Sequence, residues 1–257
     1  MTTRPRPKVA FFDFTCCEGC QLTVVDLLQD HPELLDAVEI VEFREAMSEK
    51  LPLDERYAVA FVEGSCTRES DEARLKAIRE RADFLIALGA CADLGGVNTI
   101  RNIMPLQEVR EYVYGDKAEW YETYPARPIK AVVKVDAAIP GCPIDRNEFA
   151  TAVTHLLQGR LPNLPDYPLC IECKALGTVC MYQRGQACLG PVTRAGCGAI
   201  CPAVGYGCEG CRGFVPSPNL ASMREVMREA GVSDDEIESR LRIFLTYQMM
   251  ELEGATS

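Results

Sequence analysis

Short apolar runs alternate with amphipathic stretches over the first 160 residues. The apolar runs are short enough for buried strands, and the stretches between them place apolar residues at the three-to-four spacing of a helix. We predict strands at 8–14, 57–64, 83–91 and within 131–143, and helices at 20–31, 69–82 and 147–158. Strands that alternate with helices form a parallel sheet covered on both faces, so the expected fold class is α/β.

Cysteines follow each of these predicted strands. The first strand leads into the stretch TCCEGCQLT, which starts at residue 15, and the others are followed by Cys66, Cys91 and Cys142. Ligands bind beyond the carboxyl ends of the strands in sheets of this class. The sequence therefore predicts that cysteines from distant parts of the chain meet at one edge of the sheet.

The pattern changes near residue 160. The stretch GRLPNLPDYPLC, rich in proline and without periodicity, is typical of a linker. Residues 170–213 contain eight cysteines and few large apolar side chains, so this segment is expected to need an inorganic core. Two helices are predicted after it: Ser217 or Asn219 caps the first, Gly231 ends it, and the stretch SDDE begins the second.

Composition narrows the functional class. The chain of 257 residues is long enough for one large domain or two unequal ones. Its formal net charge of −11 argues against a nucleic-acid partner, because phosphate contacts need clustered Lys and Arg. No apolar run approaches the length of a membrane span, and no export signal is recognised, so the expected location is the cytoplasm.

The 14 cysteines are the strongest chemical signal. Disulfides are rare in a reducing cytosol, so metal binding is the better interpretation. The two histidines, His31 and His155, adjoin no cysteine and are expected to be ordinary residues. The ligands are therefore nearly all sulfur, which suits zinc or iron–sulfur clusters.

The cysteines divide into groups by spacing. Cys17 and Cys20 form a CxxC pair, which alone could be a redox dithiol, but that would not need Cys91 and Cys142 at other strand ends. The run C-x2-C-x6-C-x7-C-x8-C-x3-C-x6-C-x2-C from 170 to 211 makes two sets of four, and two structural zinc ions are the alternative there. Cys16 and Cys66 are left over; each is a small buried hydrophobe, or one supplements the first site.

Five segments in order resemble one known family. They are FDFTCCEGCQLT, VEGSCTRESDE, ALGACADLGGV, IPGCPID and CLGPVTRAGCGAICPAVGYGCEGCRG. Together they resemble the small subunit of nickel–iron hydrogenases, in particular the cytoplasmic multisubunit type, such as the delta subunit of sulfhydrogenases and the methyl-viologen-reducing type of methanogens.

The resemblance implies a flavodoxin-like domain, residues 1–160, and a loop-rich iron–sulfur domain with terminal helices, residues 161–257. It also implies three 4Fe–4S clusters. The implied ligands are Cys17, Cys20, Cys91 and Cys142 for a proximal cluster, Cys170, Cys173, Cys180 and Cys188 for a distal cluster, and Cys197, Cys201, Cys208 and Cys211 for a medial cluster.

The same resemblance implies electron transfer. The nickel–iron site would lie in a large partner subunit, and electrons would leave through a flavin or iron–sulfur partner that reduces NAD(P) or another acceptor. Glu18, between two expected ligands, would lie on the interface with the large subunit rather than relay protons.

Two alternatives stay open. One is the cluster-bearing quinone-reductase subunit of complex I, which is similar in its tandem cysteines and PGCP turn; Cys20 and the eight-cysteine block argue against it. The other is a zinc-stabilised interaction module without a redox role.

Overall fold

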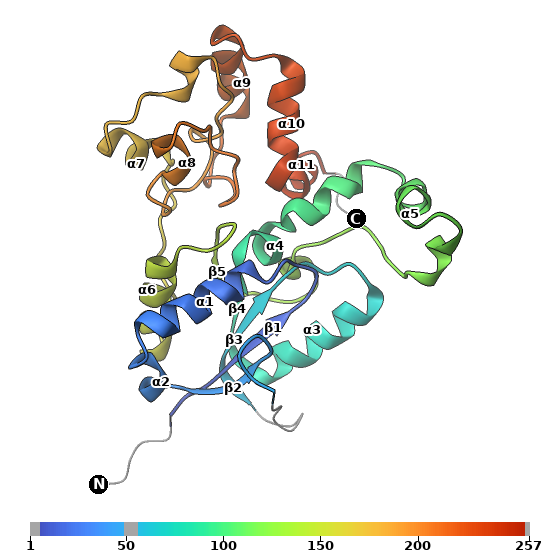
Figure 1. Ribbon diagram of the computed structural model, residues 1–257, viewed down its shortest axis with the longest axis vertical. Coiled ribbons are helices and arrows are strands. Elements are labelled where there is room, and N and C mark those ends of the chain that lie inside the picture. The colour runs from blue at the N-terminus through green and yellow to red at the C-terminus, as the bar shows by residue number, and fades with distance from the viewer. Residues whose placement is uncertain (1–5, 49–55, 255–257) are drawn as a thin grey trace.

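The fold is built on a five-stranded sheet in which every pairing is parallel. The computed structural model describes residues 6–48 and 56–254. The strand order is β2-β1-β3-β4-β5 (Figure 1). The strands are β1 (Lys8–Asp13), β2 (Glu39–Phe43), β3 (Tyr57–Glu63), β4 (Ala82–Leu88) and β5 (Ala137–Ile139). The predicted α/β class is confirmed.

Helices cover both faces of the sheet. The helices α1 (Gly19–Asp30) and α6 (Arg146–Leu157) pack on one face, and α3 (Glu69–Arg81) packs on the other (Figure 1). Successive residues of β1 serve the two faces in turn, because side chains alternate along a strand. Phe11 packs under α1 and α6, whereas Phe12 belongs to the core beneath α3.

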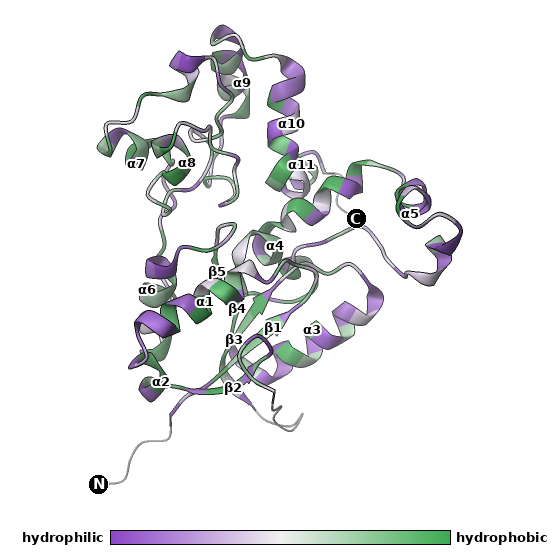
Figure 2. Ribbon diagram, in the orientation of Figure 1, coloured by the Kyte–Doolittle hydropathy of each residue, from purple (hydrophilic) through white to green (hydrophobic). Residues whose placement is uncertain are grey.

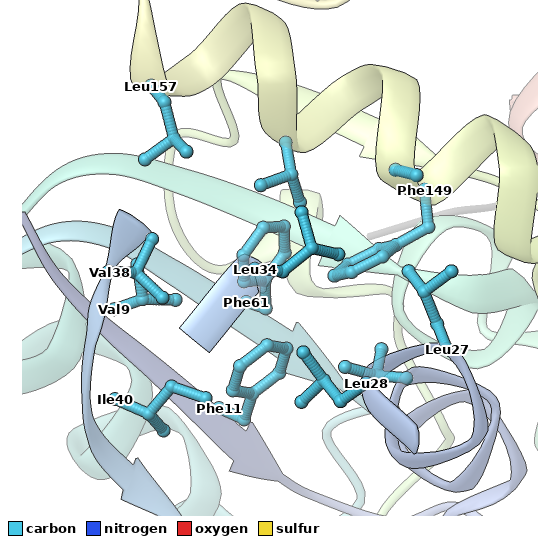
Figure 3. Close-up of a pocket in the computed structure, with 13 residues that line it drawn as sticks. Val9, Phe11, Leu27, Leu28, Leu34, Val38, Ile40, Phe61, Phe149 and Leu157 are labelled. Carbon is cyan, nitrogen blue, oxygen red and sulfur yellow. The ribbon is translucent and has the colours of Figure 1, made fainter. Parts of the chain in front are cut away.

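Aromatic residues fill the core between the sheet and α6. The Phe11 and Phe61 rings stack with centroids 5.0 Å apart, and Phe149 of α6 lies 5.2 Å from Phe61. A small apolar cavity of about 50 Å³ remains beside them, between the sheet, α1 and α6 (Figure 3). Figure 2 shows the strands as mainly hydrophobic and long hydrophilic stretches on α3. This packing fixes the strand ends, which carry the cysteines.

The observed sheet differs from the prediction at both of its edges. The strand expected within 131–143 is only three residues long, because residues 132–136 are turn and irregular backbone after the 3-10 turn η3 (Ile129–Ala131). The edge strand β2, and the short helix α2 (Leu34–Ala37) before it, were not predicted. No cysteine follows β2, so the rule that a cysteine follows every strand is wrong at this edge.

A second unpredicted region lies between β4 and β5. It contains the helices α4 (Gly89–Leu94) and α5 (Leu106–Tyr114) and the 3-10 helices η1 (Gly96–Ile103) and η2 (Gly115–Trp120). The helix α5 projects from the body of the protein (Figure 1). We call the segment from η1 to η2 the arm, and Tyr112 and Trp120 are highly exposed on it.

After residue 160 the chain has little regular structure until its last three helices. The elements are α7 (Cys170–Ala175), η4 (Met181–Arg184), α8 (Ile200–Ala203), α9 (Leu220–Glu229), α10 (Asp234–Phe244) and α11 (Thr246–Leu252). Two terminal helices were predicted and three are present. Of the two caps considered for α9, Asn219 is the one used, and Ser233 caps α10. Among the described residues, no helix has the length and apolar character needed to cross a bilayer.

The part of the chain after residue 160 lies above the sheet in Figure 1, with α10 and α11 packed against η1, the 3-10 helix that follows α4. Its core contains Leu189, Met227 and Leu241, and Leu94 of α4 joins the same cluster. The helices α9 and α10 supply five large apolar side chains to this cluster, and the cysteine-rich loops supply Met181, Leu189 and Val192. The loops are therefore packed on a helical support at the carboxyl edge of the sheet.

Candidate metal centre

Four cysteines meet where β1, β4 and β5 end. Cys17 lies in the loop after β1, and Cys142 lies in the turn after β5. Cys20 is in the first turn of α1, which the predicted helix at 20–31 covers, and Cys91 is in the first turn of α4, which was not predicted. Burial, and then the negative charges of Cys142 and Cys17, raise the pKa of Cys91 to about 12. The structure therefore brings together all four cysteines of the predicted first site.

Glycine makes this close approach possible. Gly89 has a φ of 80°, and a Cβ atom added there would lie 2.3 Å from the Cys20 sulfur. The next residue, Ala90, donates its backbone N–H to the carbonyl of Gly141 at 2.7 Å. This bond ties the start of α4 to the loop that carries Cys142. A side chain at residue 89 would push the start of α4 away from Cys20 of α1.

Gly89→Ala is therefore expected to reduce the iron content by about four atoms per chain while the other sites fill, because a 4Fe–4S cluster at this site would lose its ligand geometry. Gly115→Ala is the matched control, since Gly115 also has a positive φ but no atom lies within 4 Å of an added Cβ. The measurement is iron and labile sulfide per chain in both purified variants. Equal iron contents in the two variants would contradict the assignment of this glycine.

Glu63 at the end of β3 is a site residue that the sequence analysis missed. Its side chain is 2% exposed, and its carboxylate accepts backbone hydrogen bonds from Cys20 at 3.2 Å and Gln21 at 3.0 Å. Burial raises its pKa, and these two bonds oppose that rise. Glu63 thus fixes the first turn of α1 where a ligand is needed. An acidic residue at the end of a fully apolar strand was the available signal.

The two spare cysteines lie in different surroundings. Cys16 adjoins the first site: burial, and then the charges of Glu63 and Cys91, raise the pKa of its thiol. Cys66 is fully buried, and its backbone pairs with Arg127 in both directions at 2.9 Å. Burial, and then the charges of Asp71 and Glu72, raise its pKa to about 12; the charge of Arg127 opposes this rise, and no thiol contributes.

A second set of four cysteines lines one cavity beside α7. Cys170 and Cys173 lie one turn apart in α7. Cys180 directly precedes η4, and after η4 the chain returns to this cavity with Cys188. A Cβ added at Gly190 would lie 3.3 Å from the Cys170 sulfur and 3.5 Å from the Cys188 sulfur. The thiols lining this cavity are those of Cys170, Cys173, Cys180 and Cys188.

A third set lines a cavity of about 350 Å³ between the other two. Cys142 of the first set also lines this cavity. On the other side, the backbone N–H of Cys208 donates to the Cys188 sulfur at 3.2 Å. The third set is Cys197, Cys201, Cys208 and Cys211. The three sets therefore form a series that starts at the sheet edge and ends at α7.

The donor atoms fit iron–sulfur clusters. Burial raises the pKa of Cys170 to about 11 and of Cys211 to about 12, so without a cation these thiols stay protonated at neutral pH. Bound iron would supply the positive charge that a buried thiolate needs. His31 lies in an exposed turn beside Glu33, and His155 lies in α6, so neither belongs to a set. Among the described residues, no three His, Cys, Asp or Glu side chains are arranged to hold a single metal ion.

Comparison with known proteins places the chain in a family. Residues 17–156 match the family described as NADH ubiquinone oxidoreductase, 20 Kd subunit. Sulfhydrogenase 2 subunit delta of Pyrococcus furiosus is 38% identical over 92% of this chain and 98% of its own length. A subunit of the vhu F420-non-reducing hydrogenase of Methanocaldococcus jannaschii is 33% identical, covering 92% of each chain.

Solved structures agree with these matches. A chain of an NAD+-reducing NiFe-hydrogenase superposes with a TM-score of 0.56 and 25% identity, over 62% of this chain and 96% of that one. The protein belongs to the NADH ubiquinone oxidoreductase 20 Kd subunit family and, within it, to the small subunits of nickel–iron hydrogenases.

This membership makes the chain a subunit of an oxidoreductase that acts on H2. The complex I alternative is not favoured, because the hydrogenase relatives match nearly the whole chain, whereas the family match ends at residue 156, before the eight-cysteine block.

Proposed function

We propose that this chain carries electrons between the nickel–iron site of a large subunit and a flavin or iron–sulfur subunit that reduces NAD(P) or another acceptor. The series of three four-cysteine sets from the sheet edge to α7 carries this proposal. When bound, 4Fe–4S clusters supply one-electron transfer at these positions.

Each set is proposed to hold one 4Fe–4S cluster. The proximal ligands are Cys17, Cys20, Cys91 and Cys142, the medial ligands are Cys197, Cys201, Cys208 and Cys211, and the distal ligands are Cys170, Cys173, Cys180 and Cys188. The names follow the spatial series, in which the medial set adjoins both of the others. A division into domains at residue 160 goes with this proposal, since one site belongs to the sheet and two to the loops. The cytoplasmic location stays a prediction.

The two ends of the series have different surroundings. Cys17 is exposed at the edge of the sheet, and Glu18 beside it lies 4.0 Å from Arg44. We assign this end to the large subunit, with Glu18 on the interface. At the other end, Cys180 is exposed, and the apolar side chains of Ile171, Leu176 and Val179 are about half exposed around it. An exposed apolar patch of this kind suits a protein partner.

The test is hydrogen-dependent bleaching of the native complex, captured without oxygen through a tag on this chain. We expect a co-purifying nickel-containing subunit and visible absorbance that falls when H2 replaces argon. The control is the same preparation treated with dithionite, which gives the full extent of bleaching. A complex without nickel that bleaches with dithionite but not with H2 would contradict the hydrogenase role.

A further inference from the structure

Arg212 is the largest fully buried side chain among the described residues, at 1% exposure. It directly follows Cys211, and all three nitrogens of its guanidinium group donate hydrogen bonds. The Nε atom donates to the Ala195 carbonyl at 2.6 Å, and Nη1 donates to the Pro140 carbonyl at 3.1 Å. Nη1 and Nη2 also donate to the two carboxylate oxygens of Glu148, at 2.9 and 2.6 Å.

Arg212 and its two carbonyl partners lie on three separate ligand-bearing segments. Ala195 precedes Cys197 by two residues, and Pro140 precedes Cys142 by two residues. Arg212 itself is adjacent to Cys211. One planar group therefore joins the loop of the proximal set to both loops of the medial set. A lysine could not do this, because it lacks the rigid fork of five donors.

The ion pair also lies directly against the medial ligands. A Cβ added at Gly196 would lie 2.2 Å from Arg212 Nη2 and 2.4 Å from Glu148 Oε1. Arg212 also lines the cavity of the medial cysteines, together with Cys197 and Cys211, whereas Glu148 does not line it. The arginine end of the pair thus faces the medial set more closely than the carboxylate end does.

Stability alone is a poor reason for such a pair. Burying two charges is costly, and well-packed apolar residues of similar volume often stabilise a protein equally well. The pair at Arg212 is nevertheless almost fully enclosed, with side-chain exposures of 1% and 7%. Its position between two ligand sets points to a role at the clusters.

We propose that Arg212, oriented by Glu148, is a positioning residue of the electron path. It fixes the medial ligand loops against the Cys142 loop, and its charge stabilises the extra electron on the reduced medial cluster. This inference rests on the proposed function, because it needs a medial cluster at Cys197, Cys201, Cys208 and Cys211. A cation beside a cluster favours the more negative, reduced form and so raises the reduction potential.

The test is a redox titration of the anaerobically purified complex, followed by electron paramagnetic resonance so that each cluster is resolved. Arg212→Met/Glu148→Met removes both charges and leaves no unpaired ion in the core. Glu148→Gln keeps the positive charge of Arg212 and removes the negative charge that balances it. We expect the medial potential to fall in the double variant and to rise in Glu148→Gln, with the distal potential unchanged in both.

The matched control is Arg79→Met/Asp136→Met. That pair, 2.5 Å apart, lies at the amino ends of β4 and β5, on the sheet edge opposite the cysteines. It should leave all three potentials unchanged. If the double variant at Arg212 fails to assemble, Glu148→Gln alone tests the inference, through the direction in which its medial reduction potential shifts.

Two results would overturn the inference: a wild-type medial potential in both variants, or equal loss of all three clusters in both. The first would show that the charge does not act on the cluster, and the second that the pair serves folding in general. If the wild-type complex itself shows no medial cluster, the proposed function has failed instead.

Discussion

Replacing Cys91 with alanine is expected to abolish hydrogen-dependent reduction of any acceptor while the nickel–iron centre of the large subunit still assembles. Cys91 is in the first turn of α4, where alanine is a good helix former, so the backbone should not change. The substitution acts on the proposed proximal site, which would lose one of its four thiolates. Removing a group that only supports a metal ligand lowers metal affinity or activity about 10–100-fold. Removing the ligand itself should therefore lower turnover by more than about 100-fold.

The measurement is H2-dependent dye reduction, with nickel content and hydrogen–deuterium exchange by the large subunit as readouts of the intact nickel site. Cys66→Ala is the matched control. It removes a thiol that is even more deeply buried than that of Cys91 but is surrounded by Asp71, Glu72 and Arg127 rather than by other cysteines. It should cost about 1 kcal/mol of stability and leave turnover near wild type. Wild-type turnover in Cys91→Ala would show that the proximal assignment is wrong.

Withholding iron is expected to unfold the cysteine-rich loops and to spare the sheet. Between α6 and α9 the regular elements are only four to six residues long, and isolated bridges such as Thr193 with Phe214 hold the loops together. Eight of the cysteines lie in this segment, so the binding of two clusters would supply much of its folding free energy. The sheet instead has a continuous apolar core on both faces.

Amide hydrogen exchange, read by mass spectrometry on the iron-loaded and iron-free chain, measures this difference. Without iron, the protection factors of peptides from 170–213 should fall at least about tenfold. A tenfold fall means that the free energy of local opening is lower by about 1.4 kcal/mol. Peptides from β3 and β4 serve as the internal control and should keep theirs. Equal protection of 170–213 in both forms would mean that α9 and α10 alone hold the loops.

The sheet and the meeting point of the first cysteines were predictable because both follow from local pattern plus one topological rule. Buried strands such as β3 and β4 are continuous apolar runs, and parallel strands end at the same edge. The helix boundaries agreed to within one residue for α3 and α6, where charged or capping residues mark the ends. Ser233 capped its helix as expected for the same reason.

The missed features depend on tertiary contacts that leave little local trace. The strand β2 is a five-residue edge strand with half-buried positions, so its apolar signal is weak. The arm from η1 to η2 consists largely of 3-10 turns and exposed side chains, which have no clear period. The roles of Glu63 and Arg212 arise only after folding, when a strand end meets α1 and a loop meets α6.

The central claim is that this chain holds three 4Fe–4S clusters in series. Iron and labile sulfide analysis with Mössbauer spectroscopy of the native complex, after subtraction of the partners' share, tests it most directly. We predict about 12 irons per copy of this chain, all in 4Fe–4S clusters, with nickel in the co-purifying large subunit. About four irons per chain, with zinc in the loops after residue 160, would contradict the claim.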